Sequence, residues 1–191
     1  MSVKTIGLLS PGDMGNVVAK VLQSHGLRVL TCLKGRSERT RMLAREAHID
    51  DVPTYEALVS ETEMLLSIVV PEAALSTARL VADALHQAGR TTTYVDCNAV
   101  APETVKAIAG VITSVGSRVI DVGIIGSPPR QPGITRFYWR HRLNAEDPPR
   151  RCRHVPLRRD LAIGRGNPGN ARSGPHTGPG GRRLSGPSPG G

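Results

Sequence analysis

The sequence is poor in aromatic residues, cysteines and lysines. Its 191 residues include one Trp, three Tyr and one Phe, and its last lysine is Lys106. The three cysteines, Cys32, Cys97 and Cys152, are far apart and form neither a CxxC pair nor a cluster with histidines. This spacing excludes the common zinc and dithiol motifs and favours free thiols in a reducing cytoplasm.

Long apolar runs are also absent. No apolar stretch approaches the roughly 20 residues that a membrane-spanning helix needs. The first residues lack the pattern of a secretory signal, because their short apolar run is typical of a strand. The sequence therefore predicts a cytoplasmic protein with no membrane partner and no metal site.

Charge is unevenly distributed along the chain, which carries a formal net charge of +9. Residues 1–138 hold 14 basic and 13 acidic side chains, whereas residues 139–191 hold 11 arginines, no lysine and 3 acids. The second segment also contains 10 glycines and 8 prolines. Such a composition cannot bury enough apolar surface to offset the entropy lost on ordering. We expect an ordered domain over 1–138 and a disordered, basic, low-complexity tail over 139–191.

Short apolar runs alternate with helical periodicity in the first segment. The runs that predict strands are residues 5–9, 27–33, 64–70, 91–97 and 117–126. The stretches that predict helices are residues 13–26, 37–47, 54–61, 72–89 and 102–116. Strands buried on both faces and separated by helices are typical of a parallel sheet covered on both sides. We therefore predict an α/β fold: a Rossmann-type, doubly wound, mainly parallel sheet.

The segment "GLLSPGDMG", residues 7–15, joins the first predicted strand to the first predicted helix. It matches the G-x-G-x-x-G fingerprint only in part. Even so, the helix N-terminus would offer unpaired amides and a positive dipole end to a pyrophosphate. The predicted cofactor-binding residues here are Ser10, Pro11, Gly12, Asp13, Met14 and Gly15. The alternative is a turn that binds nothing, and an inward-pointing Asp13 carboxylate would repel a phosphate.

The second predicted strand ends in "LKGRSER". A site that selects NAD would place an acid at this point to bind the ribose hydroxyls. The sequence has Lys34, Arg36 and Arg39 instead, with Ser37 between the two arginines. Cations here suit a 2′-phosphate, so we predict NADP(H), with Arg36 and Ser37 as contacts. The alternative is a solvated, basic helix start.

With these motifs in place, the sequence resembles the β-hydroxyacid dehydrogenase family, which contains 3-hydroxyisobutyrate and 6-phosphogluconate dehydrogenases. Two further segments carry the resemblance, which covers residues 3–138. "LLSIVVPEAA" is similar to the strand and proline turn beside the nicotinamide ribose, and "YVDCNAVAPETVKAIA" to the block at the substrate end. The resemblance implies NADP as cofactor, with NAD as the alternative. It adds as cofactor-binding residues Val69, Val70, Pro71 and Asn98, and as substrate-binding residues Asn98 and Gly126.

The sequence departs from the family pattern in ways that bear on activity. Asn98 and Ala99 replace a Ser-Thr pair, and Ile125 replaces a substrate-contacting serine, which implies a different substrate. The family's catalytic lysine, a general acid/base, lies beyond the sheet and precedes a helical domain that closes the cleft and forms the dimer. No lysine follows Lys106. We therefore name no catalytic residue and expect a dinucleotide-binding chain that is catalytically incomplete and has lost its dimer, with a small hydroxyacid substrate only in an intact relative.

The predicted tail has two explanations and allows a second class of function. It is either an out-of-frame translation that begins near Tyr138–Trp139 or a genuine basic extension. Its arginines could hold a nucleic acid or another polyanion with salt-sensitive affinity. Because the tail lacks interleaved aromatics and any known nucleic-acid-binding motif, this non-catalytic function is the less favoured alternative.

Overall fold

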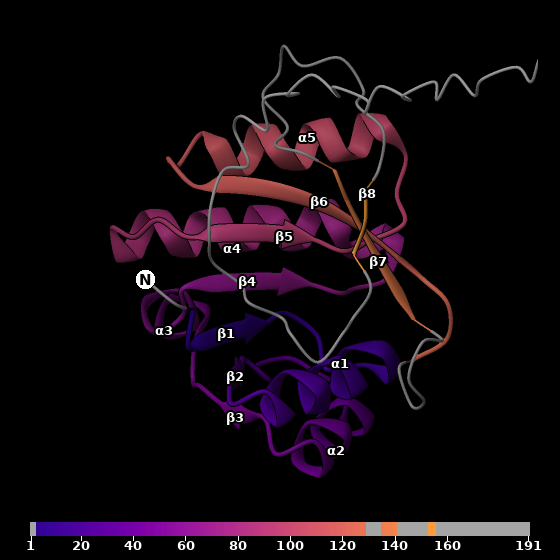
Figure 1. The fold of residues 1–191 in the computed structure, drawn as a ribbon. Helices are drawn as coiled ribbons and strands as arrows, with labels where there is room; N and C mark the ends of the chain where they lie inside the picture. Colours follow the sequence, from indigo (N-terminus) through magenta and orange to yellow (C-terminus); the bar gives the residue numbers. More distant parts are fainter. Residues whose placement is uncertain (1–2, 129–134, 141–152, 156–191) are drawn as a thin grey trace, which may run out of the picture.

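A computed structural model describes residues 3–128, 135–140 and 153–155 (Figure 1). Its strands are β1 (Thr5–Leu8), β2 (Arg28–Thr31), β3 (Asp50–Asp51), β4 (Met64–Ser67), β5 (Thr93–Asp96), β6 (Arg118–Ile125), β7 (Arg136–Arg140) and β8 (Arg153–Val155). Its helices are α1 (Asp13–Ser24), α2 (Glu38–Glu46), α3 (Tyr55–Glu61), α4 (Ala74–Ala88) and α5 (Pro102–Thr113), with a short 3-10 helix, η1 (Pro71–Ala73), before α4.

The described strands form one sheet in the order β3-β2-β1-β4-β5-β6-β7-β8. Strands β1 to β6 run parallel to one another, which confirms the predicted doubly wound, mainly parallel sheet. The strand order reverses between β1 and β4. In such folds the carboxyl ends of the strands at this point form the crevice that binds ligands.

Three strands lie outside the predicted pattern. β3 is two acidic residues that pair with β2 at the edge of the sheet. β7 and β8 add to β6 in antiparallel fashion, and β7 extends to Arg140, past residue 138. Short strands at an edge depend on backbone pairing with a neighbour, so apolar periodicity does not reveal them. Residues 141–152 and 156–191 of the predicted tail lie outside the described residues.

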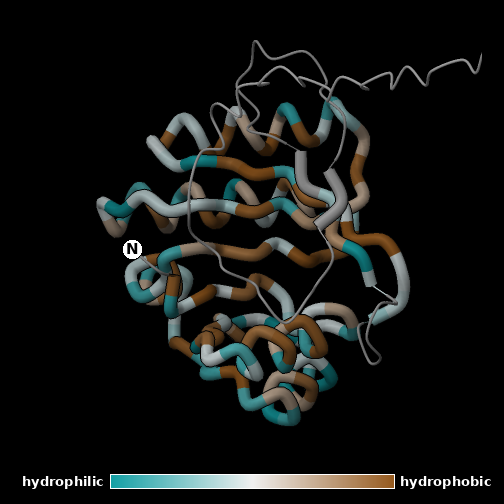
Figure 2. Tube along the Cα trace, in the orientation of Figure 1, coloured by the Kyte–Doolittle hydropathy of each residue, from teal (hydrophilic) through white to brown (hydrophobic). Residues whose placement is uncertain are grey.

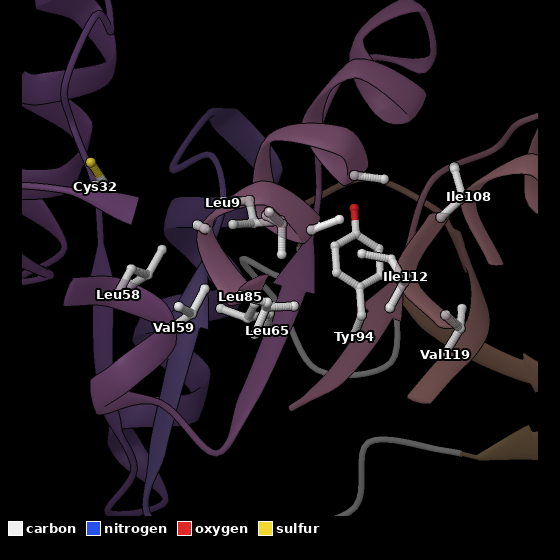
Figure 3. Packing of buried hydrophobic residues seen from close by; sticks show 14 of the residues in the cluster. Leu9, Cys32, Leu58, Val59, Leu65, Leu85, Tyr94, Ile108, Ile112 and Val119 are labelled. Atoms are coloured by element: carbon white, nitrogen blue, oxygen red, sulfur yellow. The ribbon is translucent and has the colours of Figure 1, made fainter. Parts of the chain in front are cut away.

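The main core lies between one face of the sheet and helices α3, α4 and α5. Figure 3 shows this packing, and the largest fully buried side chain in it is Tyr94 of β5. Side chains of each helix contact the same face of the sheet, among them Leu58, Leu85 and Ile112. Helices α3, α4 and α5 therefore hold the central strands from one side.

The opposite face of the sheet is covered by α1 and α2 over β1 and β2. Leu8 of β1 packs there with Ala19 of α1 and Ala44 of α2. A smaller cluster, centred on Val95 of β5 and Val122 of β6, continues this face beyond β4. Figure 2 shows hydrophobic residues along the central strands, while hydrophilic and hydrophobic residues alternate along the helices.

Local signals mark where the helices begin and end. The Ser37 hydroxyl accepts a hydrogen bond from the Thr40 amide, which makes Ser37 the N-cap of α2, at the start of the predicted helical stretch 37–47. Gly89 ends α4 in the left-handed conformation (φ 59°), which glycine adopts without a steric penalty. Within the described part of the chain, no helix combines the length and apolar character needed to cross a membrane.

Candidate dinucleotide-binding site

The turn between β1 and α1 is open. Gly12 is the N-cap of α1, and no side chain among the described residues caps this helix. A Cβ atom built on Gly12 would meet no described atom within 4 Å, so protein does not fill the space beside it. Unpaired amides and the positive end of the helix dipole suit a bound diphosphate. The turn therefore has the room and the donors that the sequence predicts.

Gly15 sets how closely α1 approaches the end of β1. A Cβ atom on Gly15 would lie 2.3 Å from the carbonyl oxygen of Ser10, a backbone atom that cannot easily move aside. The neighbouring Pro11 is buried and Met14 is half-buried. Any larger residue at position 15 would push the helix N-terminus away from the strand.

Asn16 stabilises the same turn, although the sequence reasoning missed it. Its Nδ2 donates to the carbonyl oxygens of Gly12 at 2.7 Å and of Asp13 at 3.1 Å. The side chain is buried at 5% exposure, on a helix face that is otherwise apolar. In the sequence, a single amide side chain among apolar residues of the predicted helix was the signal that could have revealed it.

Asp13 is paired with a cation across the turn. Its two carboxylate oxygens each accept a hydrogen bond from Nη2 of Arg39, at 2.8 Å. Arg39 lies in the first turn of α2, so this ion pair joins the N-termini of α1 and α2. Both side chains are exposed, Asp13 at 55% and Arg39 at 70%.

Arg36 lies just beyond the end of β2 and reaches across to β1. Its Nη2 donates to the carbonyl oxygen of Leu9 at 2.8 Å and to the Tyr55 hydroxyl at 3.2 Å. The other guanidinium nitrogens form no hydrogen bond with a described residue, so they can receive a further group. Folds of this type bind the adenosine ribose at the end of the second strand.

Two residues that sequence reasoning missed fix the loop that carries Arg36. Arg41 donates to the carbonyl oxygens of Leu33 at 2.7 Å and of Arg36 at 3.3 Å. Asp51 of β3 accepts a hydrogen bond from the Leu33 amide at 2.8 Å. The loop is therefore held from α2 and from the edge strand, while Lys34 within it is exposed.

Asn98 follows β5, and it connects the carboxyl ends of β4 and β5. Its Oδ1 accepts a hydrogen bond from the Val69 amide at 2.8 Å. Its Nδ2 donates to the Ser67 hydroxyl at 3.0 Å and to the Asp96 carboxylate. The side chain is 6% exposed. Asn98 therefore positions two strand ends; both of its Nδ2 donors are used within the protein, and its Oδ1 accepts one hydrogen bond.

Asp96 is a fully buried carboxyl group beneath this connection. Burial raises the pKa of Asp96 to about 6; hydrogen bonds from Asn98 oppose that rise, and the charge of Asp121 adds to it. Asp96 and Asp121 are direct neighbours in the β5–β6 register. One oxygen of Asp96, Oδ2, has no hydrogen-bond partner among the described residues.

The remaining predicted residues lie at the strand ends without forming a single cluster. Val69 is half-buried, whereas Val70 is 63% exposed and Pro71 begins η1. Gly126 follows β6 with a φ of 115°, next to Ile125, which is 60% exposed. No hydrogen bond connects Gly126 and Asn98 among the described residues. The structure therefore brings Val69 and Asn98 together through a hydrogen bond.

The strand order β3-β2-β1-β4-β5-β6 and the open helix N-terminus after β1 define a Rossmann-type nucleotide-binding domain. Residues 5–131 match the family described as the NAD binding domain of 6-phosphogluconate dehydrogenase. This match spans more than half of the chain, and the chain belongs to that family.

Two similar proteins match this chain at nearly 30% identity. An uncharacterized 28.5 kDa protein of Methanothermus fervidus is 29% identical over 121 residues, 63% of this chain and 45% of that protein. A conserved protein of unknown function, with structural similarity to 3-hydroxyacid dehydrogenases, has a TM-score of 0.60 and 28% identity, over 70% of this chain and 48% of that one.

The 3-hydroxyisobutyrate dehydrogenase of Mycobacterium tuberculosis shares the fold, with a TM-score of 0.56 and 18% identity over 66% of this chain and 42% of that one. The chain thus spans about half the length of the proteins that it matches.

Proposed function

We propose that this chain binds NADP(H) and is the coenzyme-binding part of an oxidoreductase that acts on CH–OH groups, as 3-hydroxyacid dehydrogenases do. One observation carries the proposal: the uncapped N-terminus of α1 is open beside Gly12, and the Arg36 guanidinium binds the carbonyl oxygen of Leu9, three residues before Gly12. The first feature suits a diphosphate and the second an additional phosphate on the adenosine ribose.

The preference for NADP(H) over NAD(H) rests on the charges at the end of β2. Arg36 is held there by Leu9 and Tyr55, and it retains donors for a further group. Asp51 of β3 accepts a hydrogen bond from the Leu33 amide, so this acid supports the loop that carries Arg36. A hydrogen-bonded phosphate–guanidinium contact is worth about 1.5–3 kcal/mol, which is enough to decide between the two coenzymes.

The proposal includes catalytic incompleteness. Bound nicotinamide would supply the hydride chemistry, but hydride transfer also requires a positioned substrate and a proton donor. Lys106 is exposed on α5, and no lysine follows it in the sequence. We therefore expect the described domain, taken by itself, to bind coenzyme without oxidising a small hydroxyacid.

A cytoplasmic location is also part of the proposal. Cys32 and Cys97 are both free thiols and both buried, as expected in a reducing compartment. Burial raises the pKa of each thiol, which makes both poor nucleophiles.

The proposal is tested by titrating the full chain with NADPH and NADH and following the nicotinamide fluorescence. The wild type should bind NADPH more tightly than NADH. Arg36→Gln should weaken NADPH binding by about 10- to 100-fold and leave NADH binding nearly unchanged, because only NADPH carries the 2′-phosphate.

Arg90→Gln is the matched control. Arg90 also donates to a backbone carbonyl, that of Ser60, but it follows α4 at the opposite end of the sheet. This variant should bind both coenzymes as the wild type does. A folded wild type that binds neither dinucleotide contradicts the whole proposal. Tighter binding of NADH than of NADPH contradicts only the choice of coenzyme.

A further inference from the structure

We propose that Asp13 limits the preference of this site for NADP(H) by occupying the guanidinium of Arg39 until a phosphate displaces it. This inference rests on the proposed function and adds a specificity-determining residue to it. The observation is the paired contact of Arg39 Nη2 with both carboxylate oxygens of Asp13, at 2.8 Å each.

The position of the pair makes Arg39 available to the coenzyme. Asp13 is the first residue of α1, where the diphosphate is expected, and Arg39 lies two residues beyond Ser37, where the adenosine ribose is expected. The guanidinium therefore lies between the two expected phosphate positions. The two arginines are held differently. Arg36 binds the carbonyl oxygen of Leu9, whereas Arg39 is held only by the Asp13 carboxylate among the described residues.

The pair can be opened without disturbing the fold. Both side chains are more than half exposed, and exposed ion pairs contribute little to stability. The other acid at this helix start, Glu38, pairs with Arg45 and does not compete for Arg39. A phosphate dianion carries more charge and more acceptor oxygens than a carboxylate, so it can replace Asp13 as the partner of Arg39.

Because the phosphate must replace Asp13 on Arg39, NADPH binds less tightly than it would if Arg36 and Arg39 were both free. Binding of the 2′-phosphate must first break the Asp13–Arg39 contact, and it then leaves an unpaired carboxylate near an anionic ligand. NADH has no 2′-phosphate, so it has no group for Arg39 to bind. Removing the charge of Asp13 should therefore favour NADPH selectively.

The test compares dissociation constants for NADPH and NADH in the full-length wild type, Asp13→Asn, Arg39→Gln and the double variant. Asp13→Asn should tighten NADPH binding by about 2- to 5-fold and leave NADH binding unchanged. In the Arg39→Gln background the same substitution should no longer change the ratio of the two constants. Glu61→Gln, which removes an exposed acid paired with Arg28 elsewhere, should change neither constant.

Three outcomes overturn the inference and one concerns the proposed function. Equal tightening of both coenzymes by Asp13→Asn would mean that Asp13 acts on the diphosphate and not through Arg39. Selective tightening that persists in the double variant would also exclude Arg39 as the intermediary, and no change in either constant would exclude Asp13. If the folded wild type binds neither dinucleotide, the proposed function fails instead.

Discussion

The two ends of the candidate site are built in opposite ways. Around β2, the charged groups are largely exposed, and arginines bind carbonyl oxygens or form ion pairs such as Asp13–Arg39. Around β4 and β5, the polar groups are buried, and one amide side chain, Asn98, connects them. The first end can exchange its partners with a ligand, whereas the second has already paired most of its donors within the protein.

This difference separates what each end contributes. Exposed pairs contribute little to folding, so changes at the β2 end should alter ligand binding more than stability. Buried polar groups are costly when unpaired, so changes at the β4–β5 end should alter stability first. The predictions below test that separation, starting with the largest expected effect.

The largest effect is expected at Asn98. Asn98→Leu removes the partner of the Val69 amide and both donors to Ser67 and Asp96, all in a buried setting. We expect the free energy of unfolding to fall by about 3–5 kcal/mol, because several buried polar groups lose partners together. The free energy of unfolding is measured at pH 7 by a urea titration monitored by circular dichroism.

Asn98→Asp keeps the size of the side chain and tests the two amide donors of Asn98. This variant keeps the acceptor for Val69 but places a second carboxylate against Asp96. It should be destabilised at pH 7 and recover in acid, when one of the two carboxyl groups takes up a proton. Asn98→Leu should recover only the part that comes from protonation of Asp96 itself. Full stability of both variants at pH 7 would contradict the buried network.

A second prediction concerns the charge of Asp96, whose pKa is raised from 3.8 to about 6 in the folded state. Folded protein therefore binds this proton more tightly than unfolded protein, and the stability from this group falls as the pH rises from about 4 to about 6. The loss is on the order of 2 kcal/mol, allowing for partial screening. Asp96→Asn should remove this decline.

The measurement is the unfolding free energy of wild type and Asp96→Asn at pH 4.5 and pH 7.5. Raising the pH from 4.5 to 7.5 should lower the unfolding free energy of the wild type more than that of Asp96→Asn. Asp121, Tyr94 and Cys97 lie close to this carboxyl group, so the comparison reports the charge of Asp96 together with its coupling to these groups. A difference that does not change with pH would mean that Asp96 has an ordinary pKa.

The same division explains what the sequence could predict. The turn at Gly12–Gly15 and the N-cap at Ser37 depend on residues within a few positions of one another, and a local pattern reveals them. The parallel sheet follows from alternating apolar runs and helical stretches, each of which is also local. The fold from β1 to β6, apart from the edge strand β3, was therefore predictable from the sequence.

The partners of the site residues were not predictable, because they come together from distant parts of the chain. Asn98 bonds the amide of Val69, 29 residues away, and Leu33 bonds Asp51, 18 residues away. Nothing in the sequence near Asn98 indicates that its amide is already used, so the resemblance assigned it to the substrate. Whether it also touches substrate stays a prediction.

The smallest expected effect, at Ser37, tests the exposed end of the site most sensitively. Ser37→Ala removes the N-cap of α2, where the hydroxyl accepts from the Thr40 amide at 3.3 Å, and it should cost about 1 kcal/mol of stability. Thr54→Ala removes the equivalent cap of α3, with its 3.1 Å bond to the Ala57 amide, and should cost a similar amount.

Only Ser37 lies beside Arg36, so the two capping variants should differ in coenzyme binding while matching in stability. Ser37→Ala should weaken NADPH binding by a few-fold more than NADH binding, since a serine hydroxyl that accepts from the helix can still donate to a phosphate. Thr54→Ala should leave the ratio of the two dissociation constants unchanged. Equal shifts of that ratio in both variants would show that loss of a helix cap, and not contact with the coenzyme, accounts for the effect.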